Sequence, residues 1–409
     1  MNRCSFSVVL FLVVSGCGES AVAPTPDVAL PLPGLDGFDA RVEWDDELAV
    51  RVVRDPYQGI DWEQARLVPV QLHDHIGADT SRIRAYDKAG YGAISMVDYS
   101  GVSWLPYART RRLWPPQDFL TPSFVSSLEN IEVFIPGAEE VGYGHVVSAF
   151  LTEFVVARRP WDLRLAGSYA STQEAIAVTQ EYGGLAFLAH PWGPKENNAY
   201  LHGMDGLEIY SAYGAVKQRE GRFDHVGGSL DAEAAMVAMW DHFLVRDQTI
   251  RGIAVNDHFG PDDTELRQDD GLKDSGKILV VAEYGELGDV RHALENGRFF
   301  AVRDQGRSKS AHLVVRSLRT DSLAIRLESE GDVSWMSGGR RIGSGPVLWL
   351  DSVPSSLRYA RAEIHVGDSV VLYSQAFGLR PQRSPSRCLG GMRVSNTSLA
   401  RCGPPTALD

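Results

Sequence analysis

Two histidines separated by a single residue, His73 and His75, are the side chains best suited to chemistry in this sequence. They end an apolar run that is typical of a β-strand, so both point to one side of the strand and Asp74 points to the other. Neutral imidazoles are the commonest metal ligands in proteins, and such a pair needs only a carboxylate or a third histidine to complete a site. Because His-x-His is frequent by chance, the prediction of a metal site depends on which other residues converge on it.

The elements that would position these residues alternate between strands and helices over about residues 62–300. The pattern predicts strands over residues 66–72, 93–97, 131–135, 145–150, 185–189, 207–210 and 253–255, and helices over 81–89, 172–182 and 232–245. Alternation of this kind indicates an α/β fold with a parallel sheet or a closed barrel.

The carboxyl ends of the predicted strands carry most of the candidate site residues. In a β/α barrel these ends form one rim, where active sites are built from residues far apart in sequence. The candidates at this rim are His73, His75, Asp98, Glu139, His190 and Asp257, whereas His145 begins its own predicted strand. Their convergence would make a metal site, and the alternative is a set of hydrogen-bonded rim histidines without a metal.

Several segments of the same region also match sequence motifs that occur in a fixed order. They are residues 72–75, 86–91, 135–139 with the later His145, 183–191 and 206–210. In these motifs the chain resembles the PHP (polymerase and histidinol phosphatase) superfamily of metal-dependent phosphoesterases, and within it the CehA/McbA-like metallohydrolases. The resemblance implies a distorted seven-stranded β/α barrel that holds two or three divalent ions, such as zinc, manganese or iron.

The resemblance also assigns a role to each candidate ligand. The matching positions are the paired histidines, His73 and His75, the bridging glutamate, Glu139, and two ligands of the second metal, His145 and His190. In the last motif Asp257 takes the place of the family's aspartate, and a register shifted by one residue would bring in His258 instead. We prefer Asp257 because a carboxylate is a good metal ligand, whereas the shifted register would use an amide.

The sequence departs from the family's motifs at positions that serve a third metal. Residues 76–80 are one residue shorter than the family's Thr-x-x-Ser-Asp-Gly and lack its glycine, although they contain Asp79. Tyr99 stands where the family has a histidine, and so does Phe259 in the unshifted last motif. A neutral tyrosine, with an ordinary pKa of about 10, is a weak ligand. We therefore expect the third site to be lost or altered, which leaves a dinuclear centre.

Such a centre implies a hydrolase that activates water against a phosphoester in a small, anionic substrate. Loss of the third ion would remove a counter-charge, so a carboxyl ester, amide or carbamate is the alternative substrate. Asp98 would orient a ligand histidine or form a structural hydrogen bond. Arg111, in an arginine-rich loop, would clamp the anion or belong to a solvated loop. We interpret Glu208, which has no matching ligand partner in sequence, as structural.

Composition limits the other functions. Among 409 residues, 44% are apolar and 23% charged, as in a globular protein of two or three domains. The formal net charge of −13 argues against a nucleic acid partner. Two further hypotheses fit the sequence: a degenerate PHP-like protein that binds metal or ligand without turnover, and a surface-anchored module that binds a carbohydrate or a partner.

The first 16 residues resemble a bacterial lipoprotein signal peptide, with a positive start, a short apolar centre and small residues before Cys17. The resemblance implies cleavage before Cys17 and its lipidation, and ordinary secretion is the alternative. Gly18 follows in place of the Asp that favours inner-membrane retention, so we expect the periplasmic face of the outer membrane. Residues 17–60 would form the lipid anchor, a proline-rich tether and possible accessory strands.

Residues 61–305 are assigned to the metallohydrolase barrel. Short apolar runs separated by turns then predict a small antiparallel β domain over residues 306–380. Residues 381–409 read as an irregular tail that contains Cys388 and Cys402. Because an even pair of cysteines in an oxidising compartment usually forms a disulfide, we predict one between these two residues.

Overall fold

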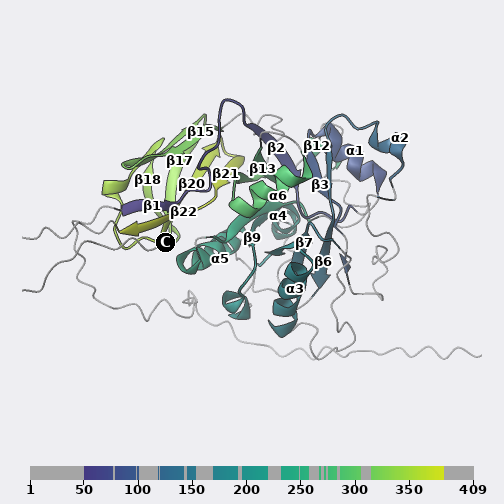
Figure 1. Cartoon of the computed structure of the whole chain (residues 1–409), viewed down its shortest axis with the longest axis horizontal. Coiled ribbons are helices and arrows are strands. Elements are labelled where there is room, and N and C mark those ends of the chain that lie inside the picture. The colour runs from purple at the N-terminus through teal and green to yellow at the C-terminus, as the bar shows by residue number, and fades with distance from the viewer. Residues whose placement is uncertain are drawn as a thin grey trace, which may run out of the picture. The chain divides into compact units, whose positions relative to one another are not determined.

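The computed structural model describes the chain between residues 50 and 381, with gaps (Figure 1). The described residues are 50–76, 79–97, 99–100, 118, 120–141, 145–152, 169–191, 196–219, 232–247, 249–257, 267–268, 271–272, 275–282, 286–304 and 315–381. They all lie within one compact unit, Asp45–Asp409. The predictions for the lipid anchor, the rim loop, the shifted register and the disulfide fall outside the described residues; these are Cys17, Asp98, Arg111, His258, Cys388 and Cys402.

A large sheet contains the strand that leads to the paired histidines. In it β2 (Arg66–Gln71), β3 (Ala93–Ser95) and β5 (Val133–Ile135) pair in parallel. On the other side of β2, β13 (Ser275–Ala282) and β14 (Phe299–Asp304) continue the sheet in antiparallel pairing. Nearly every residue of β13 is buried, as expected for a strand that is covered on both faces.

A second sheet has six strands in the order β10-β9-β8-β7-β6-β4. Its parallel neighbours are β8 (Leu185–Leu188), β9 (Gly206–Ser211) and β10 (Arg251–Val255). The next strand, β7, is antiparallel to both of its neighbours, and β6 pairs in parallel with β4. These three strands are β7 (His145–Ala149), β6 (Gly137–Val141) and β4 (Tyr99–Ser100).

Strands of both sheets pack on one apolar core, to which the first contributes Val70 and Val133 and the second Val147, Phe187 and Val255. The fold is therefore mixed α/β, but the strands do not close into the predicted seven-stranded barrel. In a closed barrel every strand has two hydrogen-bonded neighbours. In the described part of the chain β4, β5 and β10 each end a ladder. The antiparallel strands β7 and β13 interrupt the regular strand and helix alternation that the prediction assumed.

Two of the helices show why they begin and end where they do. Helix α1 (Thr80–Lys88) follows Asp79, whose carboxylate accepts the backbone N–H groups of Ser81 and Arg82. Helix α6 (Leu287–Asn296) ends at Gly297, where φ is 71°. The others are α2 (Pro122–Val125), α3 (Tyr169–Glu181), α4 (Ala212–Arg219), α5 (Ala232–Arg246) and the 3-10 turns η3 (Glu196–Tyr200) and η7 (Leu350–Ser352). No helix in the described segments is long and apolar enough to cross a membrane.

Strand pairing continues past residue 305, because β14 pairs with β21 (Val370–Ser374). The large sheet then runs through β20 (Tyr359–Val366) and β22 (Phe377–Pro381) to β1 (Val50–Arg54). The remaining strands are β17 (Asp332–Ser337) and β18 (Arg340–Ser344) beside β20, the three-stranded sheet of β15 (Val315–Thr320), β16 (Ala324–Ser329) and β19 (Val347–Trp349), and the pair β11 (Arg267–Gln268) and β12 (Gly271–Leu272). These later strands pair antiparallel, and a domain boundary at residue 305 remains a prediction.

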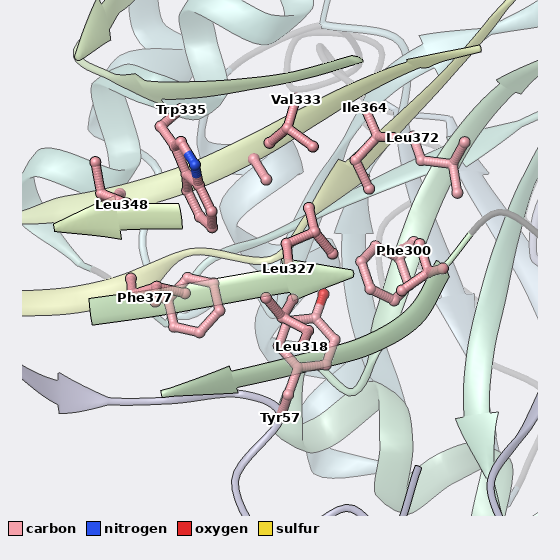
Figure 2. Close-up of a cluster of buried hydrophobic side chains, with 14 of the residues drawn as sticks. Tyr57, Phe300, Leu318, Leu327, Val333, Trp335, Leu348, Ile364, Leu372 and Phe377 are labelled. Atoms are coloured by element: carbon pink, nitrogen blue, oxygen red, sulfur yellow. The ribbon is translucent and has the colours of Figure 1, made fainter. Parts of the chain in front are cut away.

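The core of these later strands is rich in aromatic rings (Figure 2). Tyr57 stacks on Phe300 with ring centroids 5.1 Å apart. Its hydroxyl donates to the carbonyl of Phe299 over 2.8 Å and accepts the N–H of Gln375 over 3.0 Å. The buried phenol is therefore hydrogen-bonded on both sides, as a polar atom in an apolar core must be.

A buried ion pair joins helix α5 to β20. Arg361 Nε lies 2.9 Å from Asp241 Oδ1, and Arg361 Nη2 lies 3.1 Å from Asp241 Oδ2. The guanidinium also stacks on the ring of Trp240 at 5.0 Å. Burial opposes the charge, but the carboxylate of Asp241 raises the pKa of Arg361 above its ordinary value. Two parallel charge-assisted bonds thus fix the helix against the sheet.

Candidate metal centre

His73, His75 and Asp257 converge from two strands that belong to different sheets. The histidines follow β2, and Asp257 follows β10. One ligand atom from each residue lies within 4.8 Å of those from the other two. His73 Nε2 is 3.3 Å and His75 Nε2 is 3.6 Å from Asp257 Oδ1, and the three side chains are at most 6% exposed. These three residues therefore converge as the sequence predicts, although the strands that carry them do not close into a barrel.

These separations fit ligand atoms that share one metal ion. Two ligand atoms about 2.1 Å from an ion, at tetrahedral angles, lie about 3.4 Å from each other. An N–H···O hydrogen bond would be shorter, at about 2.7–3.2 Å. Two imidazole nitrogens and a carboxylate oxygen also suit zinc, manganese or iron in chemical type. His73, His75 and Asp257 could therefore hold a metal ion.

His190, with His145 beside it, lies near the second carboxylate oxygen of Asp257. His190 Nε2 is 3.8 Å from Asp257 Oδ2, and the ring of His190 meets that of His145 edge to face, with centroids 4.8 Å apart. The two carboxylate oxygens of Asp257 thus face different histidines. The side chain of His190 is 16% exposed, so this half is nearer to solvent than the buried half around His73.

Two of these residues have a backbone conformation that side chains rarely adopt. φ is 56° at Asp257 and 30° at His190. Such positive φ values outside glycine cost about 1–3 kcal/mol and cluster at functional sites. At Asp257 the strain is supported by a hydrogen bond of 2.8 Å from its N–H to the carbonyl of His73, which also ties the two strand ends together.

Glu208, which sequence reasoning treated as structural, contacts both halves of the site. Its Oε1 lies 2.6 Å from Nδ1 of His73, and its Oε2 accepts the backbone N–H of His190 over 2.6 Å. A hydrogen bond from Nδ1 to a carboxylate places the proton of the neutral ring on Nδ1, so that Nε2 carries the lone pair that can bind a metal. That nitrogen is the one that faces Asp257. The feature that could have identified Glu208 is its place in a strand that is buried throughout, because a buried carboxylate needs hydrogen-bond partners.

A polar network behind the ligands joins the two segments that carry them. The hydroxyl of Tyr86 donates to Asp74 Oδ2 over 2.7 Å and accepts from the side-chain amide of Asn256 over 2.7 Å. Asn256 Oδ1 in turn accepts the N–H of Gly276 over 2.8 Å. Burial, with the Asp74 carboxylate nearby, raises the pKa of Tyr86 well above its ordinary value, so the phenol keeps its proton. The network therefore holds Asp74 and Asn256, the neighbours of the ligands, in fixed positions.

Gly276 allows β13 to approach the end of β10 closely. A Cβ atom at this position would overlap the backbone of Val255, two residues before Asp257. Its carbonyl also accepts the side-chain amide of Gln71 over 2.9 Å. Only glycine leaves room for this contact, so the position of the Asp257 segment depends on it.

One departure from the family's motifs, at Asp79, has a local structural role. The side chains at other departures lie outside the described residues. The carboxylate of Asp79 caps helix α1, and the guanidinium of Arg82 in that helix donates to the carbonyl of His75. Asp79 thus serves the local backbone. The backbone of Glu139 lies in β6, paired with that of Tyr99 in β4, while both side chains fall outside the described part. The ligand role of Glu139 stays a prediction, as do the roles of the undescribed Asp98, Arg111 and His258.

Comparison with known proteins gives little further information. No family model matches the chain, and no curated protein matches it. Among solved structures, it is similar to a two-domain protein from Bacteroides vulgatus that is described as containing a predicted PHP-like metal-dependent phosphoesterase. The identity is 16% and the TM-score 0.40, over 79% of this chain and 98% of that chain. A likeness of this degree does not establish a shared activity.

Proposed function

We propose that the chain is a metal-dependent hydrolase of the PHP type, from the CehA/McbA-like branch, which cleaves a phosphoester in a small anionic substrate. The observation that carries the proposal is the convergence of His73 and His75 with Asp257 from strands far apart in sequence. His190 beside the second oxygen of Asp257, with the ring of His145 against it, supports the extension of the proposal to a dinuclear centre. The sequence motifs, which occur in the family's order, support the PHP assignment.

In this centre His73, His75 and Asp257 would hold one ion, and His145 and His190 would hold the other. When bound, divalent ions such as zinc, manganese or iron polarise a phosphoryl oxygen and acidify a water molecule. The two oxygens of Asp257 face both sets of histidines, so this carboxylate would serve both positions. Glu139 remains the proposed bridging ligand.

The residues around the ligands orient them and exclude water. Glu208 keeps the lone pair of His73 on Nε2, towards Asp257. The burial of His73 and Asp257 removes competing water and strengthens local electrostatic interactions. His190 is more exposed than His73, His75 and Asp257, so substrate would enter from its side. Asp98 and Arg111 stay proposed as an orienting carboxylate and an anion clamp.

A hydrolysis panel tests the proposal. Phosphomonoesters, phosphodiesters, carboxyl esters and a carbamate are offered to the wild type and to His73→Ala in the presence of manganese or zinc. We expect metal-dependent phosphoester cleavage by the wild type, reduced at least about 100-fold in the variant. Cleavage of carboxyl esters or carbamates alone would support the alternative substrate class. Metal binding without turnover of any substrate would support the degenerate, binding-only protein, and equal traces for the two proteins would exclude catalysis at this site.

We also propose that Cys17 is lipidated and anchors the chain at the periplasmic face of the outer membrane. The support is the lipoprotein-like signal over residues 1–16. In a bacterial host, metabolic labelling with a fatty acid analogue should mark the wild type and not Cys17→Ser, and only the wild type should sediment with outer membranes. Labelling of both proteins, or of neither, would contradict the anchor.

A further inference from the structure

We propose that Glu208 is a positioning residue that couples the two halves of the metal centre, an inference that rests on the proposed function. Glu208 is fully buried in the middle of β9 (Gly206–Ser211). Its neighbours Leu207 and Ile209 pack in an apolar cluster with Trp240 of α5. Because side chains alternate along a strand, Glu208 points to the opposite face, towards the ligands.

Each oxygen of this carboxylate serves a different half of the site. Oε1 accepts a hydrogen bond from Nδ1 of His73 and so fixes the orientation of that ring. Oε2 takes the backbone N–H of His190, at the residue where φ is 30°. The first contact sets a ligand nitrogen, and the second supports the strained backbone that presents the other histidine. Asp257 lies between the two histidines, 3.3 Å from Nε2 of His73 and 3.8 Å from Nε2 of His190.

Only a carboxylate of this length can make both contacts. Both donors point an N–H group at the side chain, so both of its terminal atoms must accept hydrogen bonds. Glutamine has one accepting oxygen, and its NH₂ group would face the second N–H. Replacement by glutamine therefore breaks one contact and places two donors against each other, while the volume of the side chain hardly changes. A buried N–H without an acceptor is costly, so the backbone of His190 or the ring of His73 must move.

Loss of Glu208 should weaken metal binding at both positions together. Removing a hydrogen-bond partner of a ligand typically lowers metal affinity about 10- to 100-fold. A residue that positioned only one of these histidines would change the metal affinity at only one of the two positions. Since Glu208 contacts both halves of the site, Glu208→Gln should lower the metal affinity at both positions by about this factor.

A matched control is available in Glu233 of α5. Its Oε1 accepts the hydroxyl of Tyr373 over 2.6 Å, and its Oε2 accepts Nη1 of Arg303 over 2.9 Å. Glu233→Gln therefore removes the same kind of doubly bonded carboxylate, but none of its partners is a candidate ligand. Both variants are titrated with Co²⁺ and Zn²⁺, with the visible Co²⁺ spectrum as a measure of ligand geometry. In Glu208→Gln we expect the Co²⁺ spectrum to change and the metal affinity to fall at both positions. In Glu233→Gln the spectrum and the affinities should match those of the wild type.

A second measurement does not depend on the folding of a variant. In the NMR spectrum of metal-free wild type labelled with ¹⁵N in its histidines, the ring signals of His73 are assigned as those missing from His73→Ala. They should show a proton on Nδ1. A ring of His73 without a proton on Nδ1 would overturn the inference, and so would unchanged affinities at both metal positions in Glu208→Gln. A loss of affinity confined to one of the two metal positions would contradict the coupling. If the wild type itself binds neither Co²⁺ nor Zn²⁺, the proposed function fails together with the inference, whereas tight binding by both proteins rejects the role of Glu208 alone.

Discussion

Replacing Tyr86 by Phe tests whether the network behind the ligands positions them. The phenol is buried, and its hydroxyl joins Asp74, which lies between the paired histidines, to Asn256, which precedes Asp257. Phenylalanine fills nearly the same volume, so the change removes two hydrogen bonds and little packing. The cost then comes from the two polar groups that lose their partner.

The magnitude follows from the type of each bond. A hydrogen bond to a carboxylate contributes about 1.5–3 kcal/mol, and a bond between neutral groups about 0.5–1.5 kcal/mol. Loss of both should lower the free energy of unfolding of Tyr86→Phe by about 2–4.5 kcal/mol. Because the bonds hold the segments of His73, His75 and Asp257 in register, metal affinity should also fall by about tenfold or more.

Tyr57→Phe is the control, because this buried hydroxyl also donates one hydrogen bond and accepts another, within an apolar core that contains none of the ligands. Urea unfolding of the metal-free proteins gives the stability cost, and competition with a coloured chelator gives the affinity for zinc. We expect both variants to lose stability and Tyr86→Phe alone to lose zinc affinity. Equal zinc affinities in the two variants would refute the positioning role of the network.

Three further changes test other parts of the structure. Asp241→Ala removes two charge-assisted hydrogen bonds of the buried Arg361, which keeps Glu363 as its other ion-pair partner, and should cost about 1.5–3 kcal/mol in urea unfolding; a loss below about 1 kcal/mol would contradict the contribution of the buried ion pair. Gly276→Ala should abolish metal binding in a chelator assay by displacing the Asp257 segment, whereas Gly288→Ala, with open space around it, should keep binding and gain about 0.4–1 kcal/mol. Burial lowers the pKa of His242 below 6.5, so the folded chain binds this proton less tightly than the unfolded chain, and stability is lost as the pH falls through the lowered pKa. The melting temperature of His242→Gln should therefore fall less than that of the wild type between about pH 7.5 and pH 5, and parallel falls would contradict this.

Local sequence patterns predicted the elements that carry the ligands. The strands expected over residues 66–72, 185–189 and 253–255 correspond to β2, β8 and β10, and the helix expected over 232–245 corresponds to α5. Each is an apolar run bounded by polar or turn residues, so its type can be recognised without knowledge of its partners. The convergence of His73, His75 and Asp257 then followed from the position of polar residues at strand ends.

Long-range pairing could not be predicted in the same way. Strand β13 pairs with β2, some 200 residues earlier, in antiparallel register, and local periodicity contains no information on this partner. The open arrangement of the sheets follows from such pairings. The same limit applies to Glu208, which is 135 residues from His73 in sequence and meets it only in the folded chain.

Anomalous diffraction from crystals grown with zinc or manganese tests the central claim most directly. A peak at the metal absorption edge should lie about 2.0–2.2 Å from Nε2 of His73, Nε2 of His75 and Oδ1 of Asp257, with a second peak beside His145 and His190. Full occupancy of the first position, lost in Asp257→Asn, is the result that the account predicts. Crystals with no anomalous peak among these residues, from protein that binds less than about one equivalent of metal, would contradict it.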